Sequence, residues 1–321
     1  MSGAKKKLAL TRRFPKAVEE RAERDYDAQL NPDDRPLGPD GLVELSKSVD
    51  GLLIAPTDKI DAALLARLDP RCKMIATFSV GIDHLDVEAA RARGITMSNT
   101  PDVLTDATAE IAMLLMLGAA RRAHEGQTML RADAWKGWTP TQLLGAQLTG
   151  RRLGIIGMGR IGQAVAKRAR AFDMVIHYSN RNRLPPEREQ GAAFHADPEA
   201  MLSVCDVLSF HCPASPAMHR FLDARRIELL PQGAIVVNTA RGMLIDDEAL
   251  IAALLAGRVA AAGLDVFTNE PNLHPGYRPL INAFLLPHMG SATIEARNAM
   301  GFRALDNLDA FFAGKTPPHA L

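Results

Sequence analysis

The chain has 321 residues, which gives room for about two domains. Apolar residues make up 47% of it and charged residues 23%, a composition that is typical of globular proteins and excludes a disordered or fibrous chain. Because 38 Lys and Arg residues balance 37 Asp and Glu residues, the net charge of +1 provides no overall field that would attract nucleic acid or anionic lipid. No apolar run approaches about 18 residues, so we expect neither a membrane span nor a membrane partner.

The cysteines and the N-terminal residues predict a reducing location. Cys72, Cys205 and Cys212 form no CxxC pair and no even-numbered framework of the kind that small secreted domains use. The apolar run Leu8–Leu10 is too short for a signal peptide. We therefore expect a cytoplasmic protein.

Short apolar runs alternate with helical patterns along almost the whole chain, which predicts βαβ units around a parallel sheet and hence an α/β fold. In the first part of the chain the expected strands are Leu8–Thr11, Gly51–Ala55, Lys73–Phe78 and Ile95–Ser98. The helices expected between them include Ile60–Leu68 and Val87–Arg93. Together these elements predict one small doubly wound unit.

The middle of the chain has a different pattern. From Pro101 to about Arg131 apolar residues recur at helical intervals, which predicts one long amphipathic helix that connects two domains. The following stretch, Ala132–Leu148, contains Trp135 and Trp138 among glycines and a proline and predicts an extended loop. A loop of this length in a compact chain usually has a function or packs on a partner.

A second βαβ series begins at Arg152 and predicts a larger domain. Its expected strands continue through Val175–Tyr178, Val207–Phe210, Ala234–Asn238, Gly263–Phe267 and Phe284–Leu286. The final helix, roughly Thr293–Phe312, follows immediately, and we expect it to return to the first domain.

A glycine-rich turn, within the sequence LGIIGMGRIG of residues 153–162, follows the first strand of this series. Gly157, Gly159 and Gly162 have GxGxxG spacing and Met158 lies between the first two, directly before the expected helix Gln163–Phe172. The glycines permit a tight turn, close approach of a pyrophosphate and close helix packing, and the helix N-terminus supplies N–H groups. The alternative is a tight turn without a ligand, but the strand and the helix lie where a dinucleotide site requires them.

The residues after the next strand distinguish between the two nicotinamide dinucleotides. About 20 residues beyond the glycine turn, an acidic side chain would bind the ribose 2′-hydroxyl of NAD. Here the chain has Ser179, Asn180, Arg181 and Arg183, and no carboxylate. Two arginines suit a 2′-phosphate, which accepts charge-assisted hydrogen bonds, so we predict a preference for NADPH with NADH as the alternative. The competing interpretation is that both arginines belong to a solvated loop.

Three charged side chains follow predicted strands of the second domain, at the edge where open α/β sheets bind ligands: Arg241, Glu270 and His288. A guanidinium binds a carboxylate through two parallel hydrogen bonds. A histidine beside a carboxylate is a common proton donor, because the negative charge favours the imidazolium form. Each residue alone would be read as a surface ion pair or a cap. Their occurrence together after a glycine turn predicts a site for carbonyl reduction.

With these motifs the sequence resembles the D-isomer-specific 2-hydroxyacid dehydrogenase family over nearly its whole length, and within it the glyoxylate/hydroxypyruvate reductases most. The resemblance is carried by Ser79–Asp86, Asn99–Pro101, the glycine turn, Asn238–Gly242, Gly263–Pro271 and Pro287–Thr293. It implies two Rossmann-like doubly wound parallel-sheet domains, with the cofactor domain inserted into a flavodoxin-like substrate domain. The substrate domain would comprise residues 1–100 and 291–321, and the dinucleotide-binding domain residues 101–290.

The resemblance also implies roles for single residues. His288 would be the general acid, supported by Glu270, while Arg241 would bind the substrate carboxylate and polarise the carbonyl. The backbone of Val80 and Gly81 would complete the carboxylate site. The further cofactor contacts that it implies are Arg160, Ile161, Pro213, Thr239, Asp265 and Gly290.

The implied reaction is hydride transfer from NADPH to the C2 carbonyl of a small 2-oxo acid. Family members are usually homodimers, and in the most similar reductases a tryptophan of the partner reaches the active site, a position that Trp138 matches better than Trp135. Plain interface packing is the alternative role for Trp138. Another branch of the family, of the D-lactate or phosphoglycerate type, remains an alternative function, as does a dinucleotide-sensing protein like the related transcriptional corepressors. We expect no metal site, because Asp86 is a natural helix N-cap and no further ligands converge on it.

Overall fold

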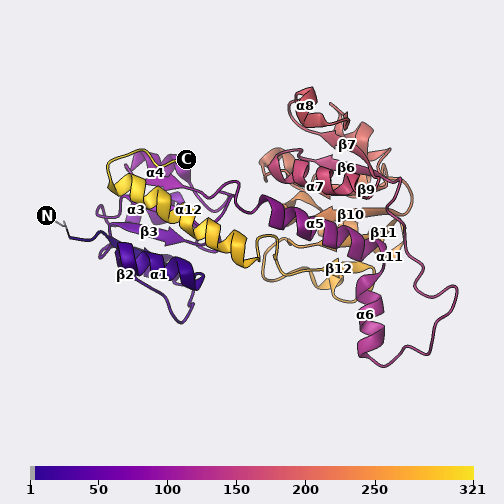
Figure 1. The fold of residues 1–321 in the computed structure, drawn as a ribbon, viewed down its shortest axis with the longest axis horizontal. Coiled ribbons are helices and arrows are strands. Elements are labelled where there is room, and N and C mark those ends of the chain that lie inside the picture. The colour runs from indigo at the N-terminus through magenta and orange to yellow at the C-terminus, as the bar shows by residue number, and fades with distance from the viewer. Residues whose placement is uncertain (1–3) are drawn as a thin grey trace. The chain divides into compact units, whose positions relative to one another are not determined.

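A computed structural model describes residues 4–321, which form two compact α/β units (Figure 1). The first unit combines the chain up to Leu104 with Ser291–Leu321, and the second unit is Thr105–Gly290. The chain leaves the first unit later than the expected boundary at residue 100, because the Pro101 carbonyl still accepts a hydrogen bond from Arg303 of the same unit. Both units are parallel-sheet α/β structures, so the fold class expected from the sequence is confirmed.

The first unit is built on a five-stranded parallel sheet with the strand order β2-β1-β3-β4-β5. Its strands are β1 (Lys7–Leu10), β2 (Asp27–Gln29), β3 (Gly51–Ile54), β4 (Met74–Thr77) and β5 (Thr96–Ser98). This order is that of a flavodoxin-like doubly wound sheet, and the winding changes direction between β1 and β3.

Alternating side chains of these strands build a separate core on each face of the sheet. Leu8 and Leu10 belong to one core, while Ala9 between them belongs to the other. The helices α1 (Lys16–Asp25) and α12 (Ile294–Phe312) cover the first face (Figure 1). The opposite face is covered by α2 (Gly38–Ser46), α3 (Ala62–Arg67) and α4 (Val87–Ala92).

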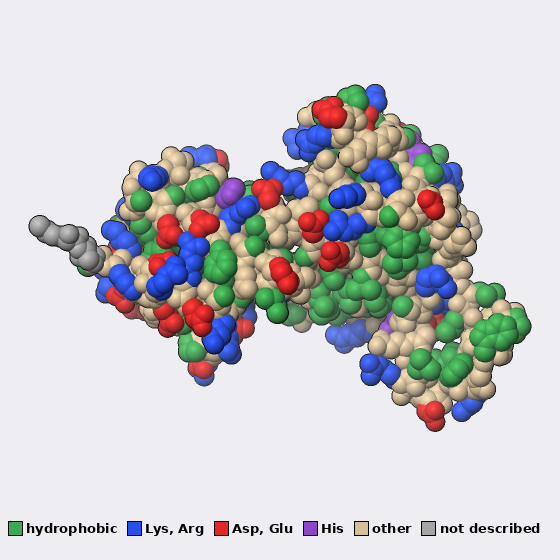
Figure 2. All heavy atoms as spheres, viewed as in Figure 1, with side chains coloured by type: hydrophobic (Ala, Val, Ile, Leu, Met, Phe, Trp, Pro, Cys, Tyr) green, Lys and Arg blue, Asp and Glu red, His purple; other side chains and the backbone are tan. Residues whose placement is uncertain are grey.

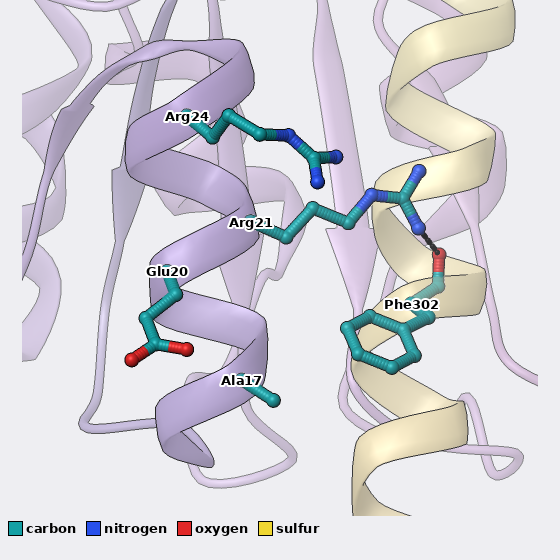
Figure 3. A pocket seen from close by; sticks show the side chains of 5 residues that line it. All are labelled: Ala17, Glu20, Arg21, Arg24 and Phe302. Atoms are coloured by element: carbon teal, nitrogen blue, oxygen red, sulfur yellow. Dashed lines mark hydrogen bonds between the residues drawn. The ribbon is translucent and has the colours of Figure 1, made fainter.

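The helices α1 and α12 lie side by side although almost the whole chain separates them in the sequence (Figure 3). Gly301 makes this approach possible, because a Cβ at that position would lie 2.2 Å from Cγ2 of Val18. The last helix is thereby part of the first unit, and Leu305 and Leu308 on its inner face are fully buried.

A hollow of about 450 Å³ lies beside these two helices, lined in part by Arg21 and Phe302 (Figure 3). Arg21 is already engaged there. Its Nη2 donates to carboxylate oxygens of Asp306 and Asp309, each at 2.7 Å, and its Nη1 donates to the Phe302 carbonyl at 3.3 Å. Arg21 therefore joins the two helices beside the hollow through these hydrogen bonds.

The second unit is built on a seven-stranded parallel sheet with the order β12-β11-β10-β9-β6-β7-β8. Its strands are β6 (Arg152–Ile156), β7 (Val175–Ser179), β8 (Ala193–Phe194), β9 (Val207–Phe210), β10 (Ala234–Asn238), β11 (Val259–Leu264) and β12 (Ala283–Leu285). The winding changes direction between β6 and β9, and ligands of such sheets bind beyond the carboxyl ends of the strands at this point.

Helices cover both faces of this sheet as well. One face packs against α5 (Thr105–Ala120) and α7 (Arg160–Arg170), which carry the apolar side chains of one core (Figure 1). The other face packs against α9 (Pro198–Leu202), α10 (Ala224–Ile227) and α11 (Asp247–Leu255). The glycine turn and the strand ends that carry the predicted site therefore lie on a rigid, doubly covered sheet.

The single long helix expected for residues 101–131 is wrong. Helix α5 ends at Ala120, and a second helix, α6 (Ala123–Arg131), follows Arg122, whose φ of 54° interrupts the helical path. Nor is α5 a connector, because it is buried within the second unit, where a Cβ on Gly263 of β11 would lie 2.7 Å from the Leu115 carbonyl oxygen. Its apolar residues lie on most of its circumference, as in a helix that is covered on several sides.

Helix α6 and the extended stretch after it, residues 123–148, form an arm that reaches away from the sheet (Figure 1). Helix α6 contains no buried residue. Leu130, Trp138 and Leu144 are 63%, 79% and 66% exposed, and Figure 2 shows hydrophobic side chains gathered on the arm. The expected extended loop thus exists, and it presents apolar side chains to solvent.

Smaller differences concern short or alanine-rich elements. The strand expected at Gly263–Phe267 is β11, which begins at Val259 and ends at Leu264, because its alanine-rich first half carries a weak strand signal. The strands β2 and β8 have three and two residues, too few for a periodic pattern. Within the described residues no helix is long and apolar enough to cross a membrane.

Candidate active site

The glycine turn lies at the carboxyl end of β6. Gly157 has a φ of 96°, and a Cβ there would lie 2.5 Å from the backbone nitrogen of Cys212, which belongs to the loop after β9. Gly162, in the first turn of α7, would bring a Cβ to 2.3 Å from the Gly157 carbonyl oxygen. Both positions require glycine, and the loops after β6 and β9 therefore meet in backbone contact where the winding changes direction.

The N-terminus of α7 is open beside this turn. Its N-cap, Gly159, is exposed, and a Cβ added there would meet nothing within 4 Å. The first turn of the helix contains no acidic residue, so its N–H groups and the positive end of its dipole remain available to an anion. Backbone donors with open space in front of them fit the pyrophosphate of a dinucleotide. Arg160 and Ile161 begin the helix at this opening.

The side chains after β7 differ in their availability. Asn180 Oδ1 accepts the Met158 N–H at 2.6 Å, and the Ser179 carbonyl accepts the Gly157 N–H at 3.0 Å, so both residues support the glycine turn. Arg181 is exposed, and no contact among the described residues holds its guanidinium. Arg183 was expected to be available for a 2′-phosphate, but it forms a bidentate pair with a glutamate of the same loop.

The loop after β10 carries Arg241. Asn238 braces this loop from within, because its Oδ1 accepts the Ala240 N–H at 2.9 Å and its Nδ2 donates to the Arg241 carbonyl at 2.8 Å. Gly242 follows, and a Cβ there would lie 2.0 Å from the carbonyl carbon of Phe267. The arginine loop therefore packs, backbone against backbone, on the loop that leads to Glu270.

Glu270 and His288 come from two neighbouring loops and meet. Nδ1 of His288 lies 2.7 Å from Oε2 of Glu270, and Oε1 of Glu270 accepts the Phe267 N–H at 2.8 Å. Burial raises the pKa of Glu270, but the hydrogen bonds from His288 and Phe267 outweigh it, and the pKa lies below its ordinary value. An ionised carboxylate only accepts hydrogen bonds, so Nδ1 of His288 carries a proton and Nε2 is the nitrogen left for a ligand.

Asp265 holds the turn that carries His288. Its carboxylate accepts the N–H groups of Met289 and Gly290 at 2.6 and 2.7 Å, and its carbonyl accepts the His288 N–H at 2.9 Å. His288 adopts a φ of 55°, in the left-handed region. Burial raises the pKa of Asp265, although the two N–H groups oppose this shift. The family resemblance implies that Asp265 contacts the cofactor, and in the structure both of its carboxylate oxygens bind this turn.

The charges of the three loops act on one another. The positive charge of Arg241 lowers the pKa of Glu270, and the charges of His288 and Glu270 act on Asp265. The three side chains predicted from strand ends therefore lie within one electrostatic site at the carboxyl edge of the sheet. Such a site offers a guanidinium for an anion and an imidazole for proton transfer.

Comparisons with known proteins find a matching family model and relatives that cover nearly the whole chain. The family model described as D-isomer specific 2-hydroxyacid dehydrogenase, NAD binding domain, matches residues 113–290. The chain is 47% identical over 320 residues to a glycerate dehydrogenase of Hyphomicrobium methylovorum, with 99% of both chains covered. It is 42% identical over 319 residues to a glyoxylate reductase of Thermococcus litoralis, covering 98% of this chain and 96% of that one.

The chain belongs to the D-isomer-specific 2-hydroxyacid dehydrogenase family. It is thus an NAD(P)-dependent oxidoreductase that acts on 2-hydroxy acids. A solved structure of an NADPH-dependent glyoxylate/hydroxypyruvate reductase from Sinorhizobium meliloti, in complex with NADP and malonate, superimposes with a TM-score of 0.88 at 31% identity, covering 99% of this chain and 97% of that one. The predicted family and activity class are therefore confirmed.

The other residues that the family resemblance points to lie around the same sheet edge or in the first unit. Pro213 is exposed in the loop after β9, and Thr239 directly follows β10. Gly290 is buried, and its carbonyl accepts the Thr108 hydroxyl at 3.1 Å. Trp138 lies on the arm.

In the first unit, Val80 and Gly81 follow β4. The Val80 carbonyl accepts the Asn99 amide at 2.9 Å, and the Gly81 carbonyl accepts the Ser79 hydroxyl at 2.7 Å. With both carbonyls bound inside the unit, the loop has a fixed conformation.

The sequence analysis missed His211, which follows β9 beside the glycine turn. Its Nε2 lies 2.8 Å from the Ser209 hydroxyl, and its Nδ1 lies 3.2 Å from the Thr239 hydroxyl. Burial of the ring lowers the pKa of His211 to about 3, so the imidazole is neutral at physiological pH and bridges two strand ends. A single histidine after an apolar strand carries no signal that distinguishes this role in the sequence.

The depressed pKa of His211 predicts a pH-dependent stability. The unfolded chain binds a proton at His211 below its ordinary pKa of 6.5, whereas the folded chain does so only near 3. The free energy of unfolding therefore falls as the pH drops from about 6.5 towards 3, and His211→Gln should flatten part of this fall. Urea unfolding of the wild type and of His211→Gln at pH 7, 6 and 5 measures how the free energy of unfolding depends on pH. The exposed His219 serves as control, since His219→Gln should keep the wild-type slope, and equal slopes for both variants would contradict the assignment.

Proposed function

We propose that the enzyme is an NADPH-dependent glyoxylate/hydroxypyruvate reductase. The observation that carries the proposal is the contact of 2.7 Å between His288 and Glu270, within the electrostatic range of Arg241. Relatives named glycerate dehydrogenase and glyoxylate reductase support the substrate class. The two names describe related chemistry, because oxidation of glycerate at C2 gives hydroxypyruvate.

His288 donates the proton to the substrate carbonyl oxygen. Glu270 binds Nδ1 and directs Nε2 away from itself, so Nε2 is the nitrogen that faces the substrate oxygen and passes the proton to it. Glu270 is thus a positioning residue for His288. Its second oxygen is bound to the Phe267 N–H, so the pair keeps its geometry without a ligand.

Arg241 binds the substrate carboxylate. A guanidinium fork matches a carboxylate through two hydrogen bonds and draws electron density from the neighbouring carbonyl. The brace by Asn238 fixes the backbone from which this side chain extends. The backbone of Val80 and Gly81 is proposed, from the family resemblance, as a further binding element for the carboxylate.

The glycine turn and the loops after β9 and β10 hold the dinucleotide. When bound, the reduced nicotinamide supplies the hydride for C2 of the substrate. The open N-terminus of α7 receives the pyrophosphate, and Pro213 and Thr239 line the cofactor at the neighbouring strand ends. Gly290, held by Asp265 through its N–H, lines the same region.

The preference for NADPH rests on the residues after β7. No carboxylate stands at residues 179–183, where an NAD-binding chain would have one for the ribose 2′-hydroxyl. The exposed Arg181 is available for a 2′-phosphate, and a relative of 31% identity has been solved with NADP. The Asn180 side chain is neutral and imposes no repulsion on the phosphate.

We also propose a homodimer formed through the arm. Leu130, Trp135, Trp138 and Leu144 expose large apolar surfaces on a segment that packs little on its own unit, and burial of such a patch favours association. The proposed position of Trp138 is against the active site of the partner subunit.

We also propose a cytoplasmic location. The free thiols Cys72, Cys205 and Cys212 are consistent with a cytoplasmic, reducing setting.

Initial rates test the activity directly. Glyoxylate, hydroxypyruvate and pyruvate are each assayed with NADPH and with NADH, following loss of the reduced nicotinamide absorbance. We expect the highest kcat/KM for the first two acids with NADPH. A higher kcat/KM for pyruvate would favour the lactate branch, and a higher value with NADH would refute the cofactor preference.

Substitution of His288 tests the proton donor. His288→Ala should lower kcat by about 10²–10⁴ because general acid catalysis is lost, while the Kd of NADPH changes little. Glu270→Gln should lower kcat less, because the imidazole remains but loses its carboxylate. Measurement of kcat and of NADPH binding for both variants separates chemistry from binding. Undiminished turnover in His288→Ala would remove the assignment.

The proposed homodimer can be tested by measuring the molar mass of the protein in solution. Light scattering should give a dimer for the wild type, and Trp138→Ala should raise the KM of the 2-oxo acid more than that of NADPH. Lys136→Ala, on the same exposed loop, serves as the matched control and should behave as the wild type. A monomeric wild type with full activity would exclude a catalytic role for the arm of a partner.

A further inference from the structure

A buried tyrosine hydroxyl organises the loop after β7. Tyr178, on β7, is fully buried, and its hydroxyl donates to Oε1 of Glu189 at 2.5 Å and accepts the Leu184 N–H at 3.0 Å. The backbone carbonyl of Glu189 accepts a hydrogen bond from Arg170 of α7 at 2.8 Å. The loop is thus closed on itself between β7 and the short helix α8 (Pro186–Glu189), and Glu189 is fixed from two directions.

Arg183 is held by the same glutamate. Its Nε lies 2.8 Å from Oε1 of Glu189 and its Nη2 lies 3.0 Å from Oε2, a bidentate pair. The Glu189 side chain is 8% exposed, whereas that of Arg183 is 64% exposed. The guanidinium also lies over the ring of Phe194 on β8, 5.9 Å from its centroid. Arg183 therefore stands at the surface, with its Nε and Nη2 groups bound to Glu189.

The pair compensates the charge of Arg183 locally. The hydrogen bonds from Arg183 and then from Tyr178 lower the pKa of Glu189, so its carboxylate is ionised at neutral pH. A ligand anion that approached Arg183 would have to displace this carboxylate or lie beside it. Arg181, two residues earlier, is exposed, and within residues 4–321 no carboxylate is paired with it.

We propose that Glu189 sets the degree of cofactor discrimination by holding Arg183 in this pair, so that Arg181 alone meets the 2′-phosphate of the dinucleotide. The proposal rests on the proposed placement of the cofactor at the glycine turn. It assigns Glu189 as a specificity-determining residue that acts through a neighbouring arginine and makes no contact with the cofactor itself. Tyr178 fixes the position of Glu189 and hence of the arginine.

The proposal predicts that substitutions of Arg183 and Glu189 have different effects on NADPH binding. If both arginines contacted the phosphate, neutralising either of them would weaken NADPH binding. With Arg183 held by Glu189, removal of Arg183 should change little, whereas removal of the glutamate charge should release a guanidinium and strengthen binding of the 2′-phosphorylated form. NADH lacks this phosphate, so its affinity should not respond.

Equilibrium titration of the full chain with NADPH and with NADH, followed by nucleotide fluorescence, tests this order without any turnover. We expect Glu189→Gln to lower the Kd of NADPH roughly 3–10-fold and to leave the Kd of NADH unchanged, in line with one added charge-assisted contact. Arg181→Gln should raise the Kd of NADPH by about 10-fold or more, and Arg183→Gln should change it by less than about 2-fold. The double variant Glu189→Gln/Arg183→Gln should lose the gain of Glu189→Gln.

Two results would overturn the proposal. One is an unchanged ratio of the two Kd values in a folded Glu189→Gln variant, and the other is a loss of NADPH affinity in Arg183→Gln as large as in Arg181→Gln. The comparison of Arg183→Gln with Arg181→Gln still tests the proposal if Glu189→Gln does not fold, because neither of these two variants changes the glutamate that the buried Tyr178 hydroxyl binds. An enzyme that preferred NADH, or that reduced another 2-oxo acid, would refute the proposed function. The role of Glu189 would be tested separately, because it predicts that Glu189→Gln lowers the Kd of NADPH relative to that of NADH whatever the substrate is.

Discussion

The active site depends on the three hydrogen bonds that Asp265 makes with the turn after β12. Its carboxylate accepts the Met289 and Gly290 N–H groups, and its carbonyl accepts the N–H of His288. A buried carboxylate is costly unless it is hydrogen-bonded, and here the backbone donors meet that cost. The turn that they fix places His288 in a left-handed conformation with its ring against Glu270. This constraint fixes the backbone from which the imidazole extends towards the carboxylate.

The loops of the site approach one another more closely than side chains would allow. Gly157 contacts the backbone of Cys212, and Gly242 contacts that of Phe267. Each contact joins a pair of loops that leave different strands at the same edge of the parallel sheet. The glycines thus join the loops after β6 and β9 to each other, and the loops after β10 and β11 to each other, on a sheet that helices cover on both faces. A rigid support of this kind keeps catalytic groups in position before a ligand arrives.

In the second unit, the groups that could bind anions differ in whether a carboxylate lies beside them. The molecule carries a net charge of only +1, so an anionic cofactor and an anionic substrate must each be bound by particular groups. Arg241 shares its site with an ionised Glu270, Arg183 is paired with Glu189, and the open end of α7 offers N–H groups with no acidic neighbour in its first turn. The two arginines thus have carboxylates close to them, whereas the backbone donors at the open end of α7 have no acidic residue in the first turn of that helix.

The sequence by itself determined the α/β class, the family, the glycine turn and the three catalytic candidates, because each depends on local patterns: apolar runs, glycine spacing and charged residues after strands. It could not determine that the helix predicted for residues 101–131 is interrupted, since Arg122, whose φ of 54° breaks the helical path, is a residue type that favours helices. Nor could it distinguish Arg181 from Arg183, or show that His211 joins two strand ends. Those properties depend on which groups the folded chain brings within hydrogen-bonding distance. Only the tertiary structure decided them, because Glu189, Thr239 and the Met289 backbone reach their partners through turns and strand order that no local pattern of residues specifies.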